Sequence, residues 1–512
     1  MLKLTLAGIS SLLTFIIFLR IAQVNTSAPQ SNLTSSQTQE YITIPTSNLA
    51  LAQTVTNDQT PRRIPSYKVP PALPLPANGG VNYYVSPTGS DNNDGLSPQQ
   101  AFQTPQKAAN LTKPGDTVYF LEGTYFPGKN WVLLQIKNSG KPNAWISYKP
   151  YPNHRVKLKQ DPVKGSWHII FSDRASYINI EGLELEGNNQ KITLKYAQSQ
   201  SKNKMNTLTN GNCLSVDGRK VEPKLKPHHW RIFNNKVHDC AGMGIGAAQA
   251  DYITVDHNEI YNNSWFTVYG NSGTGTYQSY NSDNNTTDYK MIFTNNRIYN
   301  NRLYIPWIVV GKITDGNGVI VDDGRNTQNG SKLGAYKGKT LVANNVIYNN
   351  GGSGVHAYYS DNVDIINNTV VNNNQSKEIT GGQIFANKSS NIKVLNNIMV
   401  AFPGKNVNAN WATPEEQKTN VFDYNIYWNL GRLQPRVKGP NDIVANPQFV
   451  NASNFDFRLK NSSPAVNTGL TKETVAFDQF RKTRIINCKK TRGAIEFAPL
   501  VFSINTKTNT CR

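Results

Sequence analysis

The chain has few charged residues, few cysteines and almost no long apolar run. Only 17% of its 512 residues are charged, and beyond the N-terminal segment no apolar run is long enough to span a bilayer, which excludes a polytopic membrane protein. Gly, Asn and Pro interrupt every candidate helical stretch and thereby disfavour a long coiled coil. Hydrophobic residues nevertheless make up 38%, which is enough for a large core and argues against wholesale disorder.

Acidic residues are scarce relative to basic ones. The sequence contains 53 Lys and Arg against 33 Asp and Glu, so its formal net charge is +20. An excess of this size predicts a polyanionic partner. The basic residues are scattered along the chain and no nucleic-acid-binding motif accompanies them, so nucleic acid is not the partner that we expect.

The N-terminal segment is predicted to direct export. Residues 1–28 contain an apolar stretch from Leu4 to Leu19, typical of a signal peptide or of an uncleaved anchor, and both remain open. Residues 29–80 are rich in Ser and Thr and then in Pro, which predicts a disordered linker. We therefore expect a secreted or extracytoplasmic protein that contacts a membrane only through this segment.

The cysteines fit an oxidising compartment without fixing a pairing. Cys213, Cys240, Cys488 and Cys511 allow three connectivities, of which Cys213 with Cys240 and Cys488 with Cys511 joins sequence neighbours. Four buried free thiols are an equally open alternative. The chain has no CxxC motif or zinc-type His/Cys spacing.

A short phrase of apolar residues around an asparagine recurs through the middle of the chain. Consecutive copies are 23, 38, 49, 23, 29 and 28 residues apart, so the basic unit is 23 residues. Alternating apolar residues within each unit predict short strands. Such a unit cannot bury its apolar face alone, but stacked units form a continuous core and an asparagine ladder, which predicts a parallel β-helix. The asparagines are Asn235, Asn258, Asn296, Asn345, Asn368, Asn397 and Asn425.

Six segments toward the two ends of the chain carry a family resemblance. They are NYYVSPTGSDNNDG at 82–95, PGDTVY at 114–119, GTY at 123–125, NPQF at 446–449, DFRL at 456–459 and SPA at 463–465. They resemble right-handed parallel β-helix proteins related to the pectate lyases, especially family nine polysaccharide lyases. The resemblance implies an all-β, right-handed parallel β-helix over residues 81–497, with a small N-terminal cap, loop insertions and a C-terminal tail at 498–512. This fold also carries hydrolases, epimerases and inert surface proteins.

Two insertions between repeats contain the candidate sugar-binding residues. The repeats after Asn258 and Asn296 are longer than 23 residues, and insertions in a solenoid form surface loops that often border the binding face. Aromatic rings beside polar side chains suit a sugar chain. The predicted substrate-binding residues are Tyr277, Trp307 and Asn317, together with Tyr358 from a later strand.

Strand alternation predicts which side chains share an outer face. Aligning residues 318–323 with 354–359 places small apolar residues inside and sets two outward columns side by side. Counting from the ladder asparagines extends the column of His356 to Tyr269, although a one-residue slip would turn Tyr269 away. The aligned pairs are Val319 with Val355, Ile320 with His356, Val321 with Ala357 and Asp322 with Tyr358.

The resemblance also implies a metal site and a base. In family nine lyases an Asp-Asp-Gly-x-Asp run binds calcium, and a lysine in a Gly-x-Lys setting removes the proton. The first run is Asp322-Asp323-Gly324-Arg325-Asn326 in this chain, with Asn in place of the last Asp, and the second is Gly354-Val355-His356, with His in place of Lys. Calcium is therefore a candidate cofactor, with Asp322 and Asp323 as ligands and Asp315 as a source of the missing charge.

The reaction that we expect is proton abstraction beside a uronate carboxylate. His356 is the candidate base, because a free imidazole has a pKa of about 6.5. Lys312 or Arg325 can neutralise the carboxylate, and Tyr269 or Tyr358 can return a proton. Protonation of the leaving oxygen gives a lyase, whereas protonation at C5 gives an epimerase.

We therefore predict an exported, monomeric polysaccharide lyase that acts on an acidic polysaccharide. Three alternatives remain open: a uronate C5-epimerase, a glycoside hydrolase in which Asp315, Asp322 and Asp323 supply the acid and base, and a surface protein that only binds glycan. The aspartates are also ordinary turn residues, so a purely structural role is open for them as well.

Overall fold

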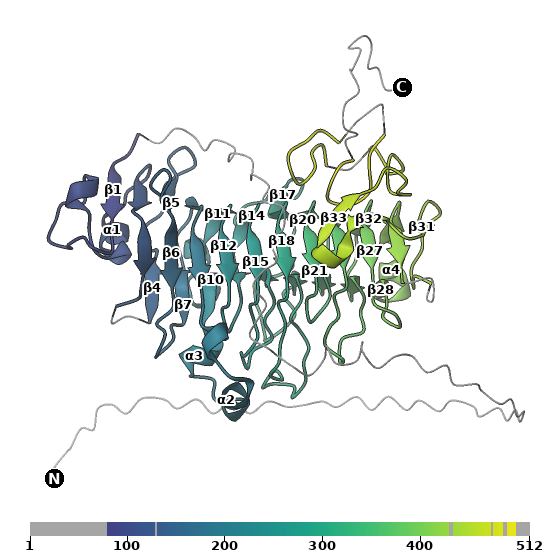
Figure 1. The fold of residues 1–512 in the computed structure, drawn as a ribbon, viewed down its shortest axis with the longest axis horizontal. Coiled ribbons are helices and arrows are strands. Elements are labelled where there is room, and N and C mark those ends of the chain that lie inside the picture. The colour runs from purple at the N-terminus through teal and green to yellow at the C-terminus, as the bar shows by residue number, and fades with distance from the viewer. Residues whose placement is uncertain (1–78, 129–130, 430–433, 473–474, 485–488, 498–512) are drawn as a thin grey trace, which may run out of the picture. The chain divides into compact units, whose positions relative to one another are not determined.

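The computed structural model describes residues 79–128, 131–429, 434–472, 475–484 and 489–497. These residues wind into three long parallel sheets, which Figure 1 shows as successive coils stacked along one axis. The predicted export segment, almost all of the predicted linker and the predicted C-terminal tail lie outside the described residues, as do Cys488 and Cys511.

Sheet A and sheet B are the two longest sheets of the described part. In spatial order sheet A contains β1 Asn82–Val85, β2 Thr117–Phe120, β5 Ile146–Pro150, β8 Ile178–Glu181, β11 His228–Phe233, β14 Asp251–Asp256, β17 Tyr289–Thr294, β20 Lys339–Ala343, β23 Val363–Ile366, β26 Ile392–Leu395 and β29 Val421–Asp423. Sheet B contains β3 Gly123–Tyr125, β6 Val156–Lys159, β9 Glu184–Glu186, β12 Lys236–His238, β15 Glu259–Tyr261, β18 Arg297–Tyr299, β21 Val346–Tyr348, β24 Thr369–Val371, β27 Ile398–Val400, β30 Ile426–Trp428 and β31 Ile443–Val444.

Sheet C completes each coil, and a few elements lie outside the three sheets. Sheet C contains β4 Val132–Gln135, β7 His168–Ser172, β10 Asn212–Asp217, β13 Ile245–Ala248, β16 Thr274–Tyr277, β19 Val319–Asp322, β22 Val355–Tyr358, β25 Ile384–Asn387 and β28 Asn408–Trp411. Besides short 3-10 helices, the elements outside the three sheets are α1 Pro105–Leu111, α2 Leu194–Ser199, α3 Thr207–Asn210, α4 Pro414–Gln417 and the antiparallel pair β32 Phe449–Asn451 and β33 Asp456–Leu459. A search of the described residues finds no helix with the length and apolar character that a bilayer crossing requires.

Parallel pairing between coils confirms the predicted solenoid. The chain passes from sheet A to sheet B to sheet C in each full coil, and a strand pairs in parallel with the equivalent strand of the next coil, as β11 does with β14 and β12 with β15. Alternate side chains of all three sheets point inward and form one continuous core, in which Val319, Val355 and Ile384 follow one another at 0% exposure. Burial of this shared core is the main driving force for stacking.

The predicted asparagine ladder is present at the turn from sheet A to sheet B. Each ladder side chain donates its Nδ2 group to the Oδ1 atom of the next, at 3.0 Å from Asn235 to Asn258 and 3.0 Å from Asn345 to Asn368. The same Oδ1 atoms accept backbone N–H groups, as when Asn296 N donates to Asn345 at 2.9 Å. The residue before each ladder asparagine has a positive φ, 59° at Asn344 for example, which asparagine tolerates well.

A second ladder, which the sequence analysis missed, lies at the turn from sheet B to sheet C. Asn301 Nδ2 donates to Asn350 Oδ1 at 3.0 Å, Asn350 Nδ2 donates to Asn373 Oδ1 at 2.8 Å, and Gln383 ends the series. Its asparagines follow those of the first ladder by five residues, as Asn350 follows Asn345. This constant offset of five residues is visible in the sequence and predicts the second ladder.

The C-terminal segment returns along the turns between sheets A and B. Leu470 N donates to Asn396 Oδ1 at 2.8 Å, Asn367 Nδ2 donates to Thr491 O at 3.2 Å, and Asn344 Nδ2 donates to Phe477 O at 2.8 Å. The asparagines of positive φ therefore hold a second stretch of chain against several coils.

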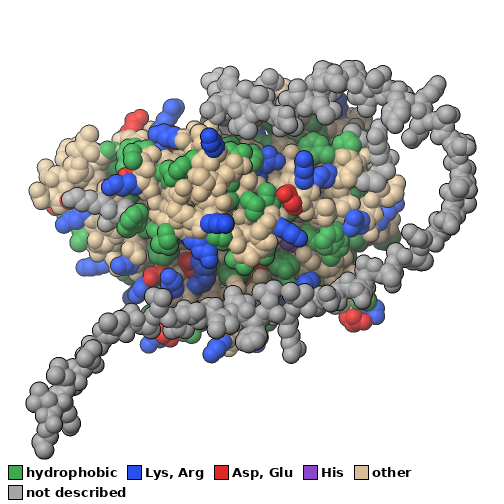
Figure 2. Space-filling model, turned by 90° about the horizontal axis from the view of Figure 1, so that it is seen from below, with side chains coloured by type: hydrophobic (Ala, Val, Ile, Leu, Met, Phe, Trp, Pro, Cys, Tyr) green, Lys and Arg blue, Asp and Glu red, His purple; other side chains and the backbone are tan. Residues whose placement is uncertain are grey.

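On the face that Figure 2 shows, basic side chains are spread out rather than gathered in one cluster. Figure 2 shows the face seen from below in Figure 1, where Lys and Arg lie among hydrophobic and neutral polar side chains and acidic side chains are fewer. This distribution agrees with the scatter of basic residues along the sequence.

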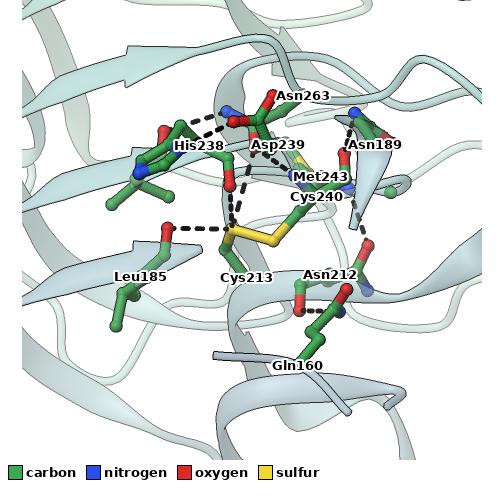
Figure 3. Close-up of a disulfide and its surroundings, with 12 residues drawn as sticks. Gln160, Leu185, Asn189, Asn212, Cys213, His238, Asp239, Cys240, Met243 and Asn263 are labelled. Atoms are coloured by element: carbon green, nitrogen blue, oxygen red, sulfur yellow. Dashed lines mark hydrogen bonds and ion pairs between the residues drawn. A yellow bond between two sulfur atoms is a disulfide. The ribbon is translucent and has the colours of Figure 1, made fainter. Parts of the chain in front are cut away.

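One disulfide links two neighbouring coils inside the solenoid. Cys213 in β10 is bonded to Cys240, two residues after the end of β12, their Cα atoms are 5.7 Å apart, and both residues are 0% exposed (Figure 3). Four free thiols are thereby excluded. The candidate pairing of Cys488 with Cys511 lies outside the described residues.

Candidate functional site

The outer face of sheet C brings several of the predicted residues together. Two outward columns run across its strands, and we call them the histidine column and the aspartate column. The histidine column contains Gly275, Ile320, His356 and Phe385, and the aspartate column contains Tyr277, Asp322, Tyr358, Asn387 and Trp411. The predicted pairing of residues 319–322 with 355–358 is confirmed residue for residue.

The predicted position of Tyr269 is wrong. Strand β16 begins at Thr274, so Gly275 occupies the histidine column and Tyr277 the aspartate column. The turn before β16 spans 262–273, whereas the turn before β22 spans only 349–354, so an equal count from the asparagines ends inside the longer turn, before β16 begins. Tyr269 instead donates its hydroxyl to Lys204 O at 3.1 Å and packs on a separate apolar cluster.

His356 presents an unpaired nitrogen on this face. Its ring stacks on Phe385, with ring centroids 4.6 Å apart and an interplanar angle of 11°. Its Nε2 atom is buried and has no hydrogen-bond partner among the described residues. Burial lowers the pKa of His356 to about 3, so the imidazole is neutral at neutral pH.

Burial raises the pKa of two carboxyl groups in this region, Asp322 and Asp315. Burial, with the nearby charge of Asp315, raises the pKa of Asp322 to about 8, although Gln328 Nε2 donates to Asp322 Oδ1 at 3.0 Å. Burial likewise raises the pKa of Asp315 to about 6, although Thr314 donates its hydroxyl at 2.7 Å. At neutral pH Asp322 is therefore mainly a neutral carboxylic acid, and Asp315 is more often ionised.

Tyrosines of the aspartate column border these carboxyls. Tyr358 lies beside Asp322 in register, and its ring centroid is 5.6 Å from that of His356. Burial raises the pKa of both Tyr358 and Tyr277, and Asn329 Nδ2 donates to the Tyr277 hydroxyl at 2.6 Å. Both tyrosines are therefore protonated hydroxyl groups at neutral pH.

The insertion after β18 contributes residues at one side of this face. A Cβ atom placed on Gly270 would lie 2.7 Å from Asp315 Oδ2 and 3.4 Å from Trp307, so both side chains pack against this glycine. Asn317 is buried, and its Oδ1 accepts a hydrogen bond from Ser353 N at 2.9 Å. It thereby supports the turn before β22. Lys312 lies in the same insertion, where its backbone pairs with Trp307, and it is exposed.

Arg325 is engaged in ion pairs away from the two columns. Its guanidinium donates to both carboxylate oxygens of Asp361, at 2.9 and 2.7 Å, and to Glu416 of α4 at 2.6 Å. The hydrogen bonds to Asp361 are the largest cause of its raised pKa. Arg325 thus joins the turns of several coils, and its charge is already balanced.

The calcium ligands implied by the resemblance do not fit the arrangement of side chains. The carboxylate of Asp323 accepts four hydrogen bonds, from Gln278 Nε2, Thr327 N, Thr327 Oγ1 and Gln328 N, which use all four of its lone-pair positions. Asp323 therefore serves its own loop and does not join Asp315 and Asp322 in a ligand set.

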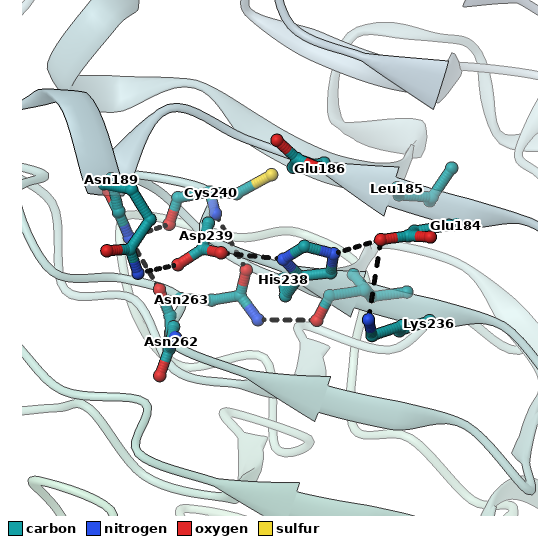
Figure 4. Close-up of polar contacts among 12 residues, drawn as sticks. Glu184, Leu185, Glu186, Asn189, Lys236, His238, Asp239, Cys240, Asn262 and Asn263 are labelled. Atoms are coloured by element: carbon teal, nitrogen blue, oxygen red, sulfur yellow. Dashed lines mark hydrogen bonds and ion pairs between the residues drawn. The ribbon is translucent and has the colours of Figure 1, made fainter. Parts of the chain in front are cut away.

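The described residues contain a different group with metal-like spacing, on the outer face of sheet B. Ligand atoms of Glu184, Glu186 and His238 lie within 4.8 Å of one another. Lysines already pair with the carboxylates, and His238 lies between Glu184 at 3.0 Å and Asp239 at 2.7 Å (Figure 4). Hydrogen bonds to Asp239 and Glu184 raise the pKa of His238 against the effect of burial, and the hydrogen bond from His238 is the largest cause that lowers the pKa of Glu184 to about 2. This group is an ion-pair network whose carboxylates are already paired.

Phe385 and Trp411 were missed as candidate site residues. The ladder spacing of 29 residues between Asn368 and Asn397, applied to His356, leads directly to Phe385. The same count from Tyr358 leads to Asn387, whose register partner is Trp411. The repeat spacing therefore predicts both positions once the alignment is extended to the coils after His356.

The parallel sheets, the ladders and the outer face define a right-handed parallel β-helix. A family model described as a right-handed β-helix region matches residues 170–400. The predicted fold is thereby confirmed, and the predicted resemblance is confirmed at the level of the fold.

Comparison with known proteins gives distant similarities along much of the chain. The "uncharacterized protein YwoF" of Bacillus subtilis (strain 168) is 23% identical over 463 residues, covering 75% of this chain and 92% of that protein. Among solved structures, pectate lyase Pel9A is 16% identical with a TM-score of 0.48, covering 81% of this chain and 96% of that one. The A-module of the mannuronan C-5 epimerase AlgE4 of Azotobacter vinelandii is 17% identical with a TM-score of 0.32, covering 67% and 94%.

Proposed function

We propose that this protein is a polysaccharide lyase that cleaves an acidic, uronate-containing polysaccharide by β-elimination on the outer face of sheet C. One observation carries the proposal: the buried Nε2 atom of His356 has no partner among the described residues and lies on the face that also carries Tyr358 and Asp322. Buried polar atoms are nearly always paired, and unpaired titratable groups are concentrated at functional sites.

The proposed base and acid follow from the protonation states. Neutral His356 accepts the C5 proton, and the negative charge of a bound uronate raises the pKa of the imidazole and thereby strengthens it as a base. The electrons of the C5–H bond form the C4–C5 double bond as the C4–O bond breaks. Tyr358, whose pKa is raised by burial, donates its proton to the leaving oxygen. The products are an unsaturated uronate end and a new free chain end.

Asp322 and Lys312, and not a metal ion, neutralise the substrate carboxylate in this mechanism. Asp322 is protonated below a pH of about 8, so its hydroxyl can donate a hydrogen bond to the substrate carboxylate that an ionised Asp would repel. Exposed Lys312 supplies a cation beside Trp307 at the edge of the same face. Arg325 and Tyr269 take no part, because both are engaged elsewhere.

A specific observation supports glycoside hydrolysis as a second candidate. Asp315 lies close enough to Asp322 for its charge to raise the pKa of Asp322, and the pKa values of Asp322 and Asp315 are about 8 and about 6. A pair of carboxyls with separated pKa values suits a general acid and a general base. In that mechanism Asp322 protonates the glycosidic oxygen and Asp315 activates water.

We also propose that the protein is exported and acts as a monomer outside the cytoplasm. The apolar N-terminal stretch supports export, and the buried disulfide is typical of an oxidising compartment.

The test is incubation of the purified chain with polygalacturonate and alginate, with and without a chelator. A lyase produces ultraviolet absorbance from the unsaturated ends, whereas a hydrolase produces reducing ends without that absorbance. We expect absorbance that resists the chelator and is lost in His356→Ala, with Phe477→Ala as the exposed control. Retention of the polymer without either product would identify a glycan-binding protein and would end the enzyme proposal.

A further inference from the structure

An exposed tryptophan ends the aspartate column. Trp411 is 43% exposed, although tryptophan is usually mostly buried, and it lies on β28, the last strand of sheet C. Neighbouring strands are about 4.8 Å apart, so Trp411 lies about 14 Å from Asp322, three strands away along the column. A polymer lying on this column would reach Trp411 several sugar units from the site of cleavage.

A chain of ring contacts joins Trp411 to His356. Phe385 is buried at 5% exposure and stacks on His356, with centroids 4.6 Å apart. The edge of Phe385 meets Trp411 with centroids 4.7 Å apart at 79°. Phe385 therefore holds both rings in place, and Trp411 offers a fixed aromatic surface, which suits a sugar ring.

One cation lies beside this ring, and a second follows the register partner of Trp411. The guanidinium of Arg436 is 5.9 Å from the ring centroid of Trp411 and is fixed by donation from Nε to Asn406 Oδ1 at 3.1 Å. Lys388 follows Asn387, is exposed, and donates to the Tyr359 hydroxyl at 2.8 Å. Glu416 is the acidic residue that acts on Lys388, and its carboxylate is already paired with Arg325. The local charge is therefore positive.

We propose that Trp411 and Arg436 form a distal subsite for a uronate sugar of the same polysaccharide chain that occupies the aspartate column. The sugar ring packs on Trp411 while its carboxylate pairs with Arg436. This inference rests on the proposed function, because that function places the polysaccharide along the aspartate column. The binding of a uronate sugar at Trp411 and Arg436 is nevertheless a separate claim. It implies that the protein acts on long chains within the polymer and binds short oligomers weakly.

The experiment compares uronate oligomers of increasing length with Trp411→Ala, Arg436→Gln and the control Phe477→Ala. Retention on an immobilised polyuronate gel is measured beside KM and kcat. We expect both site variants to raise KM about tenfold for long oligomers, which is a typical effect of removing an aromatic or Arg anchor, and to leave kcat and the KM of the shortest oligomers unchanged. Arg436→Gln should also reduce the salt dependence of retention.

The outcomes separate the two proposals. Unchanged length dependence in both site variants, with lyase activity present, overturns the subsite and leaves the proposed function standing. Weaker retention in both variants, with no product from any polyuronate, supports the subsite and overturns the proposed function. An equal effect of Phe477→Ala overturns the subsite, and a wild-type protein that neither binds nor cleaves any polyuronate overturns both.

Discussion

At the scale of single residues, the titration of Asp322 distinguishes the two catalytic proposals. Asp322→Asn keeps a hydrogen-bond donor but cannot titrate or supply a proton. If Asp322 neutralises the substrate carboxylate, the kcat of the wild-type protein should fall above a pH of about 8, where Asp322 ionises. The variant should stay active and should not show this fall. If Asp322 is the general acid of a hydrolase, the variant should lose activity by about 10²–10⁴-fold. A pH profile of kcat for both proteins is the measurement.

The same carboxyl group should make stability depend on pH. Its pKa is raised from 3.8 to about 8, so between these values the folded state holds a proton that the unfolded state has lost. Stability should therefore fall as pH rises through this range, by at most about 1.4 kcal/mol per pH unit. Denaturant unfolding at several pH values should show a smaller slope in Asp322→Asn, and an equal slope in both proteins would contradict the assignment.

His238, on the outer face of sheet B, should give a second pH dependence. Asp239 and Glu184 raise the pKa of His238 above its ordinary value of 6.5. The stabilising effect of the protonated imidazole is therefore complete below pH 6.5 and is lost as the pH rises through the pKa of the folded state. Glu184, with a pKa of about 2, is stabilising above 4.5 and loses that effect as pH falls toward 2. The midpoint of thermal unfolding should therefore decline on both sides, and His238→Gln should reduce the decline on the alkaline side, to which Asp322 also contributes.

At the scale of elements, the asparagine ladder should be a major source of stability. Asn345→Ala removes four hydrogen bonds of the side chain and leaves Asn296 N without its acceptor inside the turn. We expect a loss of about 2–4 kcal/mol, because buried polar groups left unpaired each cost about 1–3 kcal/mol. Asn461→Ala, at an exposed position, should change stability by less than about 0.5 kcal/mol. Denaturant unfolding of both variants provides the comparison.

The elements also show how far sequence can predict this fold and site. The repeat predicts the coil, the ladder and the pairing of β19 with β22, because an alternating strand has only two possible faces. The position of Tyr269 could not be predicted, because the lengths of the turns before β16 and β22 differ. The ion pairs of Arg325 and the saturated carboxylate of Asp323 depend on side-chain directions that residue spacing does not contain.

At the scale of the whole molecule, the C-terminal segment should couple the stability of separate coils. Arg484 is fully buried, pairs with Glu496 at 3.4 Å and donates to Asn344 Oδ1 at 2.7 Å. Arg484→Ala leaves the buried Glu496 uncompensated and should cost about 3–5 kcal/mol. The matched control is Arg458→Ala, whose exposed pair with Asp456 should contribute less than about 1 kcal/mol.

The returning segment also bears on cooperativity. Coils of a solenoid contact only their neighbours, so such a molecule can fray from one end like a linear chain of weakly linked units. Because the returning segment holds Asn344, Asn367 and Asn396 at once, three coils cannot open one by one without releasing it. Amide hydrogen exchange should accordingly show these coils opening as a single unit in the native protein and in successive steps in Arg484→Ala.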